Sequence, residues 1–393
     1  MTERIQVDVL IVGSGPSGSS TALHLLQQDA AWAGRMVVVD KAVHPREKLC
    51  GGGITHMGQN ILADLGLDLQ PRCFEVREVR LLYEDKSYSF FGKPVFRIVR
   101  RAEFDHWLVQ QVESYGVPVR QGEAVKAVTP LADFVEVETE RAIFEAKVLV
   151  AADGSRSFVR RALKWGNDGT HVARLLEVLT PENPQVTPEF GEQTAVFDFT
   201  RLTDGLQGYY WDFPSYVDGK PFMNRGVFDS RARPERPKTD LKGDLRDLMA
   251  ERQRDLADYE LKGHPIRWWD GNGRFSQPRV ILVGDAAGAD PLMGEGISFA
   301  LGYGKVAAQA ISAAFAQQDF SFADYKERLL ADSLFRQLDL RTRLAKFAYL
   351  MKYPWFVRWG WGAARWLIRL TRWRDREYVP TRLGGQYSVN SNQ

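Results

Sequence analysis

Three glycines near the start of the chain have the spacing of a nucleotide-binding turn. Gly13, Gly15 and Gly18 follow the apolar residues 7–12, and a helical pattern begins directly behind them. The apolar run predicts a buried parallel strand. Gly13 would make the tight turn, Gly15 would let backbone approach a pyrophosphate, and Gly18 would let helix and strand pack closely. The start of the helix would offer free N–H groups and partial positive charge to the phosphates.

A carboxylate stands where such a turn needs one. Residues 36–39 predict a second strand, which ends in Asp40, about 20 residues beyond the glycines, where the acid can accept hydrogen bonds from ribose hydroxyls. Asp40 would repel a 2′-phosphate, so the pattern favours FAD or NAD. The alternative is a glycine-rich turn that serves geometry alone and holds no ligand.

Three further segments could bring polar groups or bare backbone to a ligand. Asp153-Gly154 and Gly284-Asp285 each follow an apolar strand, at the edge where open α/β sheets bind ligands. Each pair taken singly is more often a simple turn. The three glycines 51–53 follow Arg46 and Lys48, and such glycines let the backbone lie close to a ligand. A flexible surface loop is the alternative for this segment.

The elements that must position these residues alternate between strand and helix. Residues 78–83 and 86–91 predict a hairpin around Glu84-Asp85, and a helix should begin near residue 101. Further strands are expected at residues 117–128, 134–139 and 142–151. Residues 170–269 are mostly strand-like, and a long alanine-rich helix should begin at Met293. A dinucleotide-type strand recurring at residues 279–283 implies that the far end of the chain completes the first domain.

The predicted fold class is therefore α/β: a Rossmann-like FAD-binding domain with an inserted β-rich substrate domain and a C-terminal helical region. The first comprises residues 1–73, 97–169 and 270–318, and the second residues 74–96 and 170–269. The C-terminal helical region comprises residues 319–393.

Bulk properties exclude several classes of protein. A net charge of +2 over 393 residues gives no indication of nucleic-acid binding. Only two cysteines, Cys50 and Cys73, are present, which argues against a disulfide scaffold and for a reducing compartment. No pattern predicts a metal site. The first strand begins within seven residues of Met1 and no uncharged apolar run could span a bilayer, so a cytoplasmic protein is expected.

Together these motifs resemble the FAD-dependent oxidoreductases of the para-hydroxybenzoate hydroxylase fold. The glycine turn with Asp40 is similar to their ADP site, and Asp153-Gly154 to their second motif. Gly284-Asp285 and the segment 291–297 are similar to their ribityl-binding motif and flavin-facing helix. Residues 101–108, R-A-E-F-D-H-W-L, resemble their R-x-x-F-D-x-x-L helix, whose arginine lies near the flavin. The resemblance implies the following cofactor-binding residues: Gly13, Gly15, Pro16, Ser17, Gly18, Asp40, Lys41, Arg46, Cys50, Gly51, Gly52, Arg101, Asp153, Gly154, Gly284, Asp285, Pro291, Gly294, Gly296 and Ile297.

Within that group, two segments resemble the geranylgeranyl reductase family. Residues 45–53, P-R-E-K-L-C-G-G-G, are similar to its loop beside the isoalloxazine, and residues 209–214, Y-Y-W-D-F-P, match its Y-x-W-x-F-P motif. Residues 262–266 only weakly echo a third motif, so no role is assigned to His264, for which an ordinary strand-end histidine is the favoured interpretation.

The resemblance implies hydride transfer from reduced flavin to a double bond of an isoprenoid chain. The electron donor would be NAD(P)H or a ferredoxin. The helix start at residues 294–297 would stabilise negative charge on the flavin. The predicted substrate residues are Tyr209, Trp211, Phe213 and Pro214, and the predicted catalytic residues are Cys50, Gly51 and Gly52. Cys50 would protonate the partner carbon, tune the flavin ring or serve packing alone.

Residues 354–376 predict an amphipathic basic helix. Phe356, Trp359 and Ala363 fall on one face with Trp366, Leu367, Leu370 and Trp373, and Arg358, Arg365, Arg369, Arg372 and Arg376 fall on the other. Such a helix suits the surface of an anionic membrane, which would place the protein peripherally at the cytoplasmic membrane. The alternative is a helix packed on the protein's own core with a solvated basic face.

Two other functions remain open. A flavin monooxygenase would share the scaffold and differ in its substrate pocket. Halogenases carry a motif similar to residues 209–214, but the C-G-G-G segment departs from theirs and makes halogenation the weaker alternative. A flavoprotein that only carries electrons at a membrane is the third interpretation.

Overall fold

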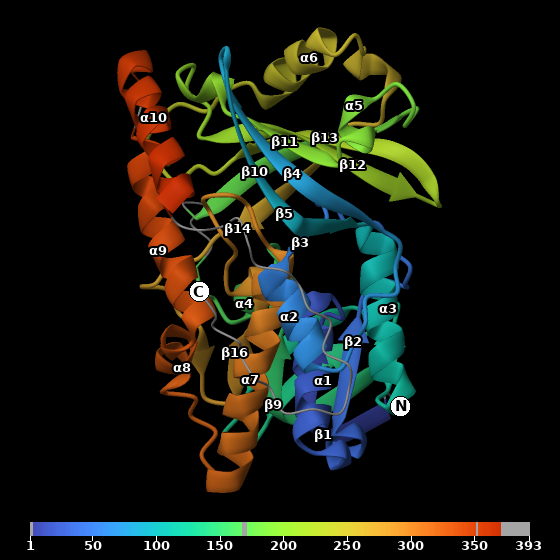
Figure 1. The fold of residues 1–393 in the computed structure, drawn as a ribbon. Coiled ribbons are helices and arrows are strands. Elements are labelled where there is room, and N and C mark those ends of the chain that lie inside the picture. The colour runs from blue at the N-terminus through green and yellow to red at the C-terminus, as the bar shows by residue number, and fades with distance from the viewer. Residues whose placement is uncertain (1–2, 167–170, 351–352, 371–393) are drawn as a thin grey trace.

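The computed structural model describes residues 3–166, 171–350 and 353–370, with backbone alone for Pro354 and residues 364–370. Two large sheets are arranged one above the other, each with helices of its own (Figure 1). The chain passes between the sheets several times, so neither sheet is built from one continuous stretch. The cavity described below is lined from both sheets.

The first sheet has the order β15-β16-β9-β1-β2-β6, and the β7–β8 hairpin extends it beside β9. Strands β1, β2, β6, β9 and β16 run parallel to one another. The strands of this sheet are β1 (Glu3–Val12), β2 (Met36–Asp40), β6 (Val119–Gln121), β7 (Val125–Pro130), β8 (Val135–Thr139), β9 (Ala142–Ala151), β15 (Ser276–Gln277) and β16 (Val280–Leu282). Helices cover the buried centre, which explains the continuous apolar runs.

The predicted extent of one strand in this sheet was wrong. Residues 117–128 form two strands, β6 and β7, which lie in different parts of the sheet. The chain turns between them at Gly122, whose φ is +65°, and at Glu123, whose buried carboxylate accepts a hydrogen bond from Thr139. A glycine readily adopts this left-handed conformation.

Helices α1 (Pro16–Gln28) and α7 (Ile297–Gln317) pack closely together against the first sheet. Ser20 Oγ donates to Leu301 O over 2.7 Å, and a Cβ at Gly304 would lie 2.6 Å from Ser20 Cβ. Helix α7 begins at Ile297 and not at Met293 as predicted, since Gly294 has a φ of +68°. Other elements near this sheet are α2 (His56–Asp64), α3 (Arg101–Ser114), α4 (Phe158–Ala162), η1 (Ala30–Gly34) and η4 (Gly284–Ala286).

The second sheet has the order β14-β10-β13-β12-β11-β4-β5-β3 and is antiparallel except where β4 meets β11. The predicted hairpin is confirmed and longer than expected: β4 (Cys73–Tyr83) and β5 (Lys86–Val99). The other strands and helices here are β3 (Gly53–Thr55), β10 (Val172–Pro181), β11 (Thr194–Asp198), β12 (Gly208–Val217), β13 (Lys220–Asp229), β14 (Lys262–Arg267), α5 (Pro188–Gly191), α6 (Leu241–Glu251), η2 (Thr200–Leu202) and η3 (Leu256–Asp258). On one face of this sheet, Val178, Tyr210 and Val227 pack against the apolar side chains of α6.

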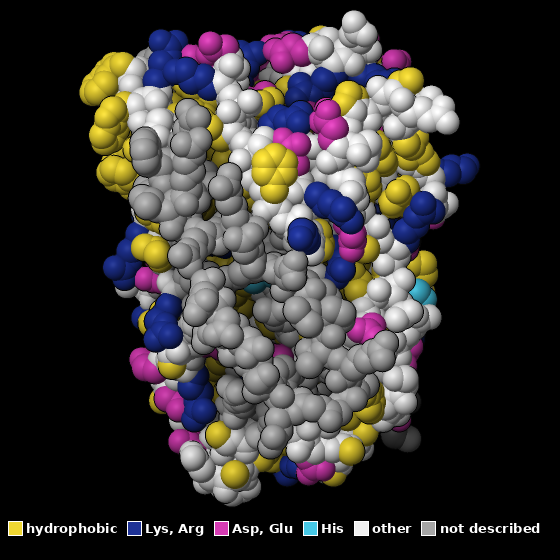
Figure 2. Space-filling model, in the orientation of Figure 1, with side chains coloured by type: hydrophobic (Ala, Val, Ile, Leu, Met, Phe, Trp, Pro, Cys, Tyr) yellow, Lys and Arg dark blue, Asp and Glu magenta, His cyan; other side chains and the backbone are white. Residues whose placement is uncertain are grey.

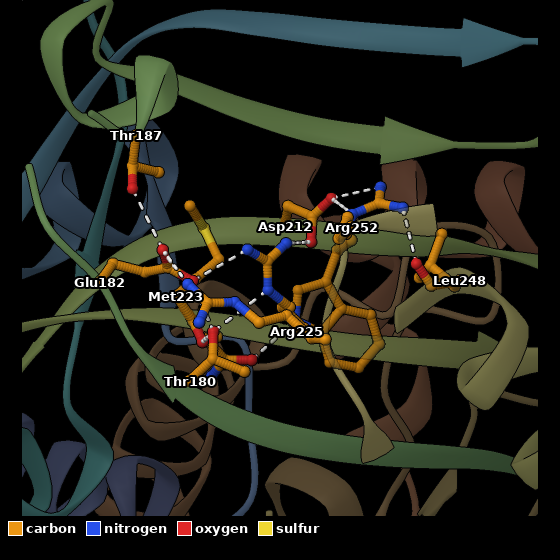
Figure 3. Close-up of polar contacts among 11 residues, drawn as sticks. Thr180, Glu182, Thr187, Asp212, Met223, Arg225, Leu248 and Arg252 are labelled. Carbon is orange, nitrogen blue, oxygen red and sulfur yellow. Dashed lines mark hydrogen bonds and ion pairs between the residues drawn. The ribbon is translucent and has the colours of Figure 1, made fainter. Parts of the chain in front are cut away.

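A buried ionic network lies on the α6 side of this second sheet (Figure 3). Arg225 donates to Asp212 over 2.5 Å and to Glu182 over 3.0 Å, and Asp212 also accepts from Arg252 over 2.6 Å. Arg225 and Asp212 are buried. A buried charge is tolerated only when it is paired in this way, so the network fixes β12 and β13 to each other and to α6.

Helices α8 (Tyr325–Ala331), α9 (Ser333–Ala348) and α10 (Pro354–Leu370) run along one side of the molecule, from the first sheet to the second (Figure 1). Trp361 of α10 packs against Tyr83, Tyr88 and Phe199, and Arg358 pairs with Glu84 over 2.9 Å. The predicted helix continued to residue 376, but residues beyond 370 lie outside the described part. Within the described ranges, no helix combines the length and the apolar character needed to cross a membrane.

Candidate active site

A single large cavity of 1020 Å³ extends between the two sheets. Its lower part is lined by the turns at the carboxyl ends of the first sheet. Its upper part is lined by the inner face of the second sheet. The first sheet contributes mainly glycine turns and charged side chains, and the second sheet mainly aromatic rings.

The glycine turn has the geometry that a dinucleotide requires. Gly13 has a φ of +106°, and a Cβ there would lie 2.4 Å from Ala152 O. A Cβ at Gly18 would lie 1.9 Å from Gly13 O, so this position brings α1 against the strand. A Cβ at Gly15 would meet only Arg46, at 3.5 Å. Gly15 therefore leaves a cradle open toward the cavity, as a pyrophosphate needs.

Asp40 is held ionised at the end of β2. Its Oδ2 accepts from Ser14 N over 2.8 Å and from Ser14 Oγ over 2.7 Å, and its Oδ1 accepts from Ala42 N over 2.9 Å. Burial favours the protonated acid, but these bonds and that of His44 outweigh it and hold the pKa of Asp40 well below its usual range. An ionised carboxylate that lines the cavity can accept the ribose hydroxyls.

Two arginines bring positive charge to the middle of the cavity. Arg101 makes two 2.8 Å bonds to the carboxylate of Asp105, and Arg46 lies 3.2 Å from the same carboxylate. Asp105 is fully buried, and both arginines line the cavity. The shared acid orients both guanidinium groups, which suit phosphate recognition.

A buried carboxylate oxygen of Asp153, which also lines the cavity, is left without a partner among the described residues. Asp153 Oδ2 accepts from Val159 N over 3.0 Å, but its Oδ1 has no hydrogen-bond partner among the described residues. Asp285, which accepts from Ser155 over 3.1 Å, lines the same part of the cavity. Unsatisfied buried oxygens are rare, so Asp153 fits a ligand that donates hydroxyl groups, as the sugar alcohol parts of FAD do.

The Cys50 turn, residues 50–52, lines the cavity next to the second sheet. Gly52 has a φ of +79°, and a Cβ there would lie 2.1 Å from Val99 O. A Cβ at Gly51 would touch the Phe213 ring at 3.0 Å. Gly52 N donates to Cys50 Sγ over 3.4 Å. The turn is therefore packed tightly between β5 and β12, which explains its glycines.

Side-chain hydrogen bonds from α9, in the C-terminal part of the chain, hold the segment before α7 in place. Arg341 of α9 donates to Asp290 over 2.9 Å and to Glu295 over 2.6 Å. Glu295 also accepts from Thr55 over 2.6 Å. Gly294, Gly296 and Ile297 line the cavity beside the start of α7, which supplies N–H groups and partial positive charge.

Aromatic rings form the upper wall of the cavity. Tyr209, Trp211 and Phe213 of β12 all point to this side because strand residues alternate between faces. Phe96, Phe197 and Phe228 extend the wall on neighbouring strands. The Tyr209 hydroxyl donates to Met293 O, and Trp211 Nε1 donates to Asn224 Oδ1 over 2.7 Å. The wall is apolar, with its few polar groups already paired.

A family profile described as the FAD binding domain matches residues 6–314. The chain belongs to this FAD-binding family. It is an FAD-dependent oxidoreductase with an α/β fold of the para-hydroxybenzoate hydroxylase type.

Relatives of this flavoprotein include several named reductases. It is 28% identical to the menaquinone reductase of Mycobacterium tuberculosis, over 89% of this chain and 85% of that protein. It is 26% identical to digeranylgeranylglycerophospholipid reductase 2 of Methanopyrus kandleri, over 81% of this chain and 80% of that protein. These relatives support the resemblance to the geranylgeranyl reductase family.

Solved structures show the same fold. A geranylgeranyl bacteriochlorophyll reductase-like protein from Thermoplasma acidophilum aligns with a TM-score of 0.72 and 23% identity, over 88% of each chain. A mutant of the halogenase PltM in complex with FAD aligns with a TM-score of 0.67 and 17% identity, over 88% of this chain and 76% of that one.

Most of the predicted site residues of this flavoprotein line the one cavity. Those that do are Gly13, Gly15, Pro16, Ser17, Asp40, Lys41, Arg46, Cys50, Gly51, Gly52, Arg101, Asp153, Gly154, Asp285, Gly294, Gly296, Ile297, Tyr209, Trp211 and Phe213. Gly18, Gly284, Pro291 and Pro214 do not. Gly284 packs on Ser17 with a φ of +59°, and Pro214 falls on the opposite face of β12 from Phe213.

Sequence reasoning missed a contact between the two ends of the cavity. Lys48 Nζ lies 2.5 Å from His264 Nε2, and His264 lines the cavity. Burial, and then the Lys48 charge, lower the pKa of His264 to about 4, so the neutral ring accepts from the Lys48 amine, whose own pKa is also lowered by burial. The strand alternation that places His264 beside Ile266 was the available signal.

Proposed function

We propose that this flavoprotein reduces carbon–carbon double bonds of an isoprenoid chain. The observation that carries the proposal is the continuity of one cavity from the FAD-side turns to the aromatic wall of the second sheet. A long apolar chain needs such a wall, and its burial there is favourable. Relatives named for menaquinone and for digeranylgeranylglycerophospholipid, both of which carry isoprenoid chains, support the same class of substrate.

The chain's own residues would bind and orient the cofactor and the substrate, and would exclude water from the site. When bound, reduced FAD supplies the hydride, with electrons that we propose come from NAD(P)H or a ferredoxin. The N–H groups at the start of α7 would stabilise negative charge near Gly296 and Ile297. The aromatic wall would hold a double bond over the flavin site. Cys50, in the turn that faces this wall, would donate the proton to the partner carbon or shape the flavin pocket.

A flavin monooxygenase is the second candidate, because a probable FAD-dependent monooxygenase from Pseudomonas aeruginosa has the same fold, with a TM-score of 0.62 and 19% identity. Such an enzyme would use the same cofactor side and insert oxygen into an organic substrate. A flavoprotein that only relays electrons would be reduced and reoxidised without net change in the added lipid. These alternatives differ in their products, so one experiment separates them.

The experiment is anaerobic photoreduction of the purified holoprotein, followed by addition of a geranylgeranyl lipid. Flavin reoxidation with a gain of two hydrogens per double bond supports the reductase. Reoxidation only after oxygen enters, with a gain of one oxygen atom, would assign a monooxygenase. A Trp211→Ala variant should lose reoxidation by lipid but keep photoreduction, and Trp165→Phe, at a tryptophan that does not line the cavity, should keep both.

We further propose that the C-terminal helices seat the protein on an anionic lipid surface. Most exposed large hydrophobic side chains in the described part of the chain lie on α9, on α10 or between these two helices, and we call them the apolar strip. Its members are Leu340, Leu344, Phe347, Leu350, Tyr353, Trp355 and Trp359. Figure 2 shows hydrophobic side chains gathered at the edge where Figure 1 places α10.

Two observations favour lipid as the occupant of the apolar strip. Arg343 of α9 pairs with Asp339 over 2.8 Å, but 78% of its side chain is exposed, which suits contact with anionic headgroups. Gln337 and Arg341, also of α9, line the cavity, so a lipid substrate would reach the site beside the strip. In α10, Trp361 packs on the protein, while Trp359 is 67% exposed and would be available to a lipid surface.

Vesicle cosedimentation tests this binding to an anionic lipid surface. The holoprotein should pellet with phosphatidylglycerol vesicles, and a Trp355→Ser/Trp359→Ser variant should bind roughly tenfold more weakly. A Phe91→Ser/Tyr115→Ser variant, changed at exposed aromatics elsewhere, should bind like wild type. Equal binding by all three proteins would overturn the proposal, as would a dimer that the Trp355/Trp359 variant alone abolishes.

A further inference from the structure

Asn224 lies where the two walls of the cavity meet. Its Nδ2 donates to Cys50 O over 3.2 Å, and its Oδ1 accepts from Trp211 Nε1 over 2.7 Å. Asn224 is 4% exposed. One buried amide therefore ties the Cys50 turn on the flavin side to the central aromatic ring on the substrate side.

Glu177 of β10 lies beside this amide. In the sheet register, Gly226 of β13 pairs with Glu177 on one side and with Trp211 on the other. A Cβ at Gly226 would lie 2.3 Å from the Trp211 ring, so the indole lies over this glycine toward Glu177. Glu177 is also buried, and its Oε2 has no hydrogen-bond partner among the described residues.

The strand that carries Asn224 is fixed from its other face. Arg225, the next residue, points to the α6 side and is held by Asp212 and Glu182 (Figure 3). Thr180 also bonds to Met223 O on that side. Because neighbouring strand residues face opposite ways, this anchoring directs the Asn224 side chain to the opposite face of the sheet, toward Trp211 and the Cys50 turn.

We propose that Asn224 and Glu177 are positioning residues that set the Cys50 turn against Trp211. Asn224 bonds to both parts directly, and Glu177 closes the buried space beside them. The pair acts through Cys50 and Trp211 and lines no part of the cavity itself. The inference concerns the site of the proposed function, but the position of the turn can be measured without any substrate.

The charge of Glu177 should change this arrangement. Burial raises the pKa of Glu177 to about 7, and Glu47 raises it further, while Arg100, Asn224 and the Cys50 N–H oppose the rise. Lys262, directly across on β14, is paired with Glu47 over 3.3 Å and with Glu260 over 2.9 Å. His264, two residues further along β14, contacts Lys48 of the loop before Cys50. As a carboxylate Glu177 accepts hydrogen bonds only, and as an acid it also donates.

Thiol reactivity tests the positioning role. In a Cys73→Ser background Cys50 is the only thiol, and its rate of reaction with an aromatic disulfide reports how tightly the turn is held. Asn224→Leu should raise the rate about tenfold, the equivalent of one lost buried hydrogen bond. Asn272→Leu, at an exposed asparagine, should leave it unchanged. Should Asn224→Leu lose FAD, Asn224→Ser removes the same bonds with less bulk.

Unchanged thiol reactivity in a folded Asn224 variant would overturn the positioning role. The absorption spectrum of bound oxidised FAD supplies the second measurement. It should shift with an apparent pKa near 7 in wild type and in Glu260→Gln, and not in Glu177→Gln. A shift that survives Glu177→Gln, or no shift in wild type, would overturn the role of Glu177. Neither measurement uses a lipid, so failure here is distinct from failure of the reductase proposal.

Discussion

The two walls of the cavity position their functional groups by different means. The FAD-side wall consists of turns at the carboxyl ends of parallel strands, where glycine geometry places bare backbone against the ligand. The substrate-side wall is the face of a mostly antiparallel sheet, where rings from several strands are aligned by the register. The first wall depends on single backbone positions. The second depends on side chains anchored from behind, so the two should fail differently when altered.

The largest effect is expected for Gly18→Ala on the FAD-side wall. The added Cβ would lie 1.9 Å from Gly13 O, so α1 must move away from the turn, and the variant should retain no FAD after purification. Flavin absorbance per protein measures this. Gly34→Ala, where a Cβ meets nothing within 4 Å, is the matched control and should keep full FAD. Normal FAD content in Gly18→Ala would show that the turn is less constrained than its geometry implies.

The substrate-side wall should respond to Arg225→Met with lost stability and retained FAD. Removing one member of a buried ion network typically costs about 3–5 kcal/mol, and here Asp212 and Glu182 lose their common partner. Denaturant unfolding gives the free-energy change, and the spectrum gives bound FAD. Arg246→Met, at an arginine with 67% of its side chain exposed, should change stability little. If the Arg225→Met variant lost bound FAD as well as stability, the two walls would not be independent.

The contrast between the two walls also explains which features of the structure could be predicted from the sequence alone. The FAD-side residues Gly13, Gly15 and Asp40 act within a short strand, turn and helix, and such local patterns can be recognised directly. Gly122 shows the limit: a single left-handed residue divides a predicted strand into β6 and β7. Gly294 likewise delays the start of α7 to Ile297. Element types were predictable, but breaks that depend on one backbone angle were not.

The substrate-side wall shows what sequence reasoning could not supply. The bond from Asn224 to Cys50 O joins residues 174 positions apart, and Glu177 meets Trp211 only through the register at Gly226. His264 was interpreted as an ordinary strand residue, but the cavity places it against Lys48. These contacts follow from sheet order and register, which no local pattern encodes.

Acidic groups on the two walls should give opposite pH dependences of stability. Glu177 has a raised pKa, so the native state holds its proton more tightly than the unfolded chain does. Wild type should therefore lose roughly 3 kcal/mol relative to Glu177→Gln between pH 4.5 and 7. Asp40 has a lowered pKa, so its contribution is present above its ordinary pKa and is lost as pH falls below it. Unfolding curves for wild type, Glu177→Gln and Asp40→Asn across pH would measure both slopes. A wild-type curve parallel to that of Glu177→Gln would contradict the buried, protonated acid.

The smallest effect should come from the contact that joins the walls. Lys48 comes from the FAD-side loop and His264 from β14, so their bond couples the two ends of the cavity. His264→Leu leaves the Lys48 amine without this acceptor and should cost roughly 2 kcal/mol, whereas His264→Gln offers a carbonyl oxygen in its place and should recover most of that loss. Unfolding free energies compare the two variants, and FAD dissociation constants show whether the loss reaches the other wall. If Leu and Gln behave alike, the contact is mere proximity; if only Gln restores FAD affinity, a hydrogen bond links the substrate sheet to the cofactor loop.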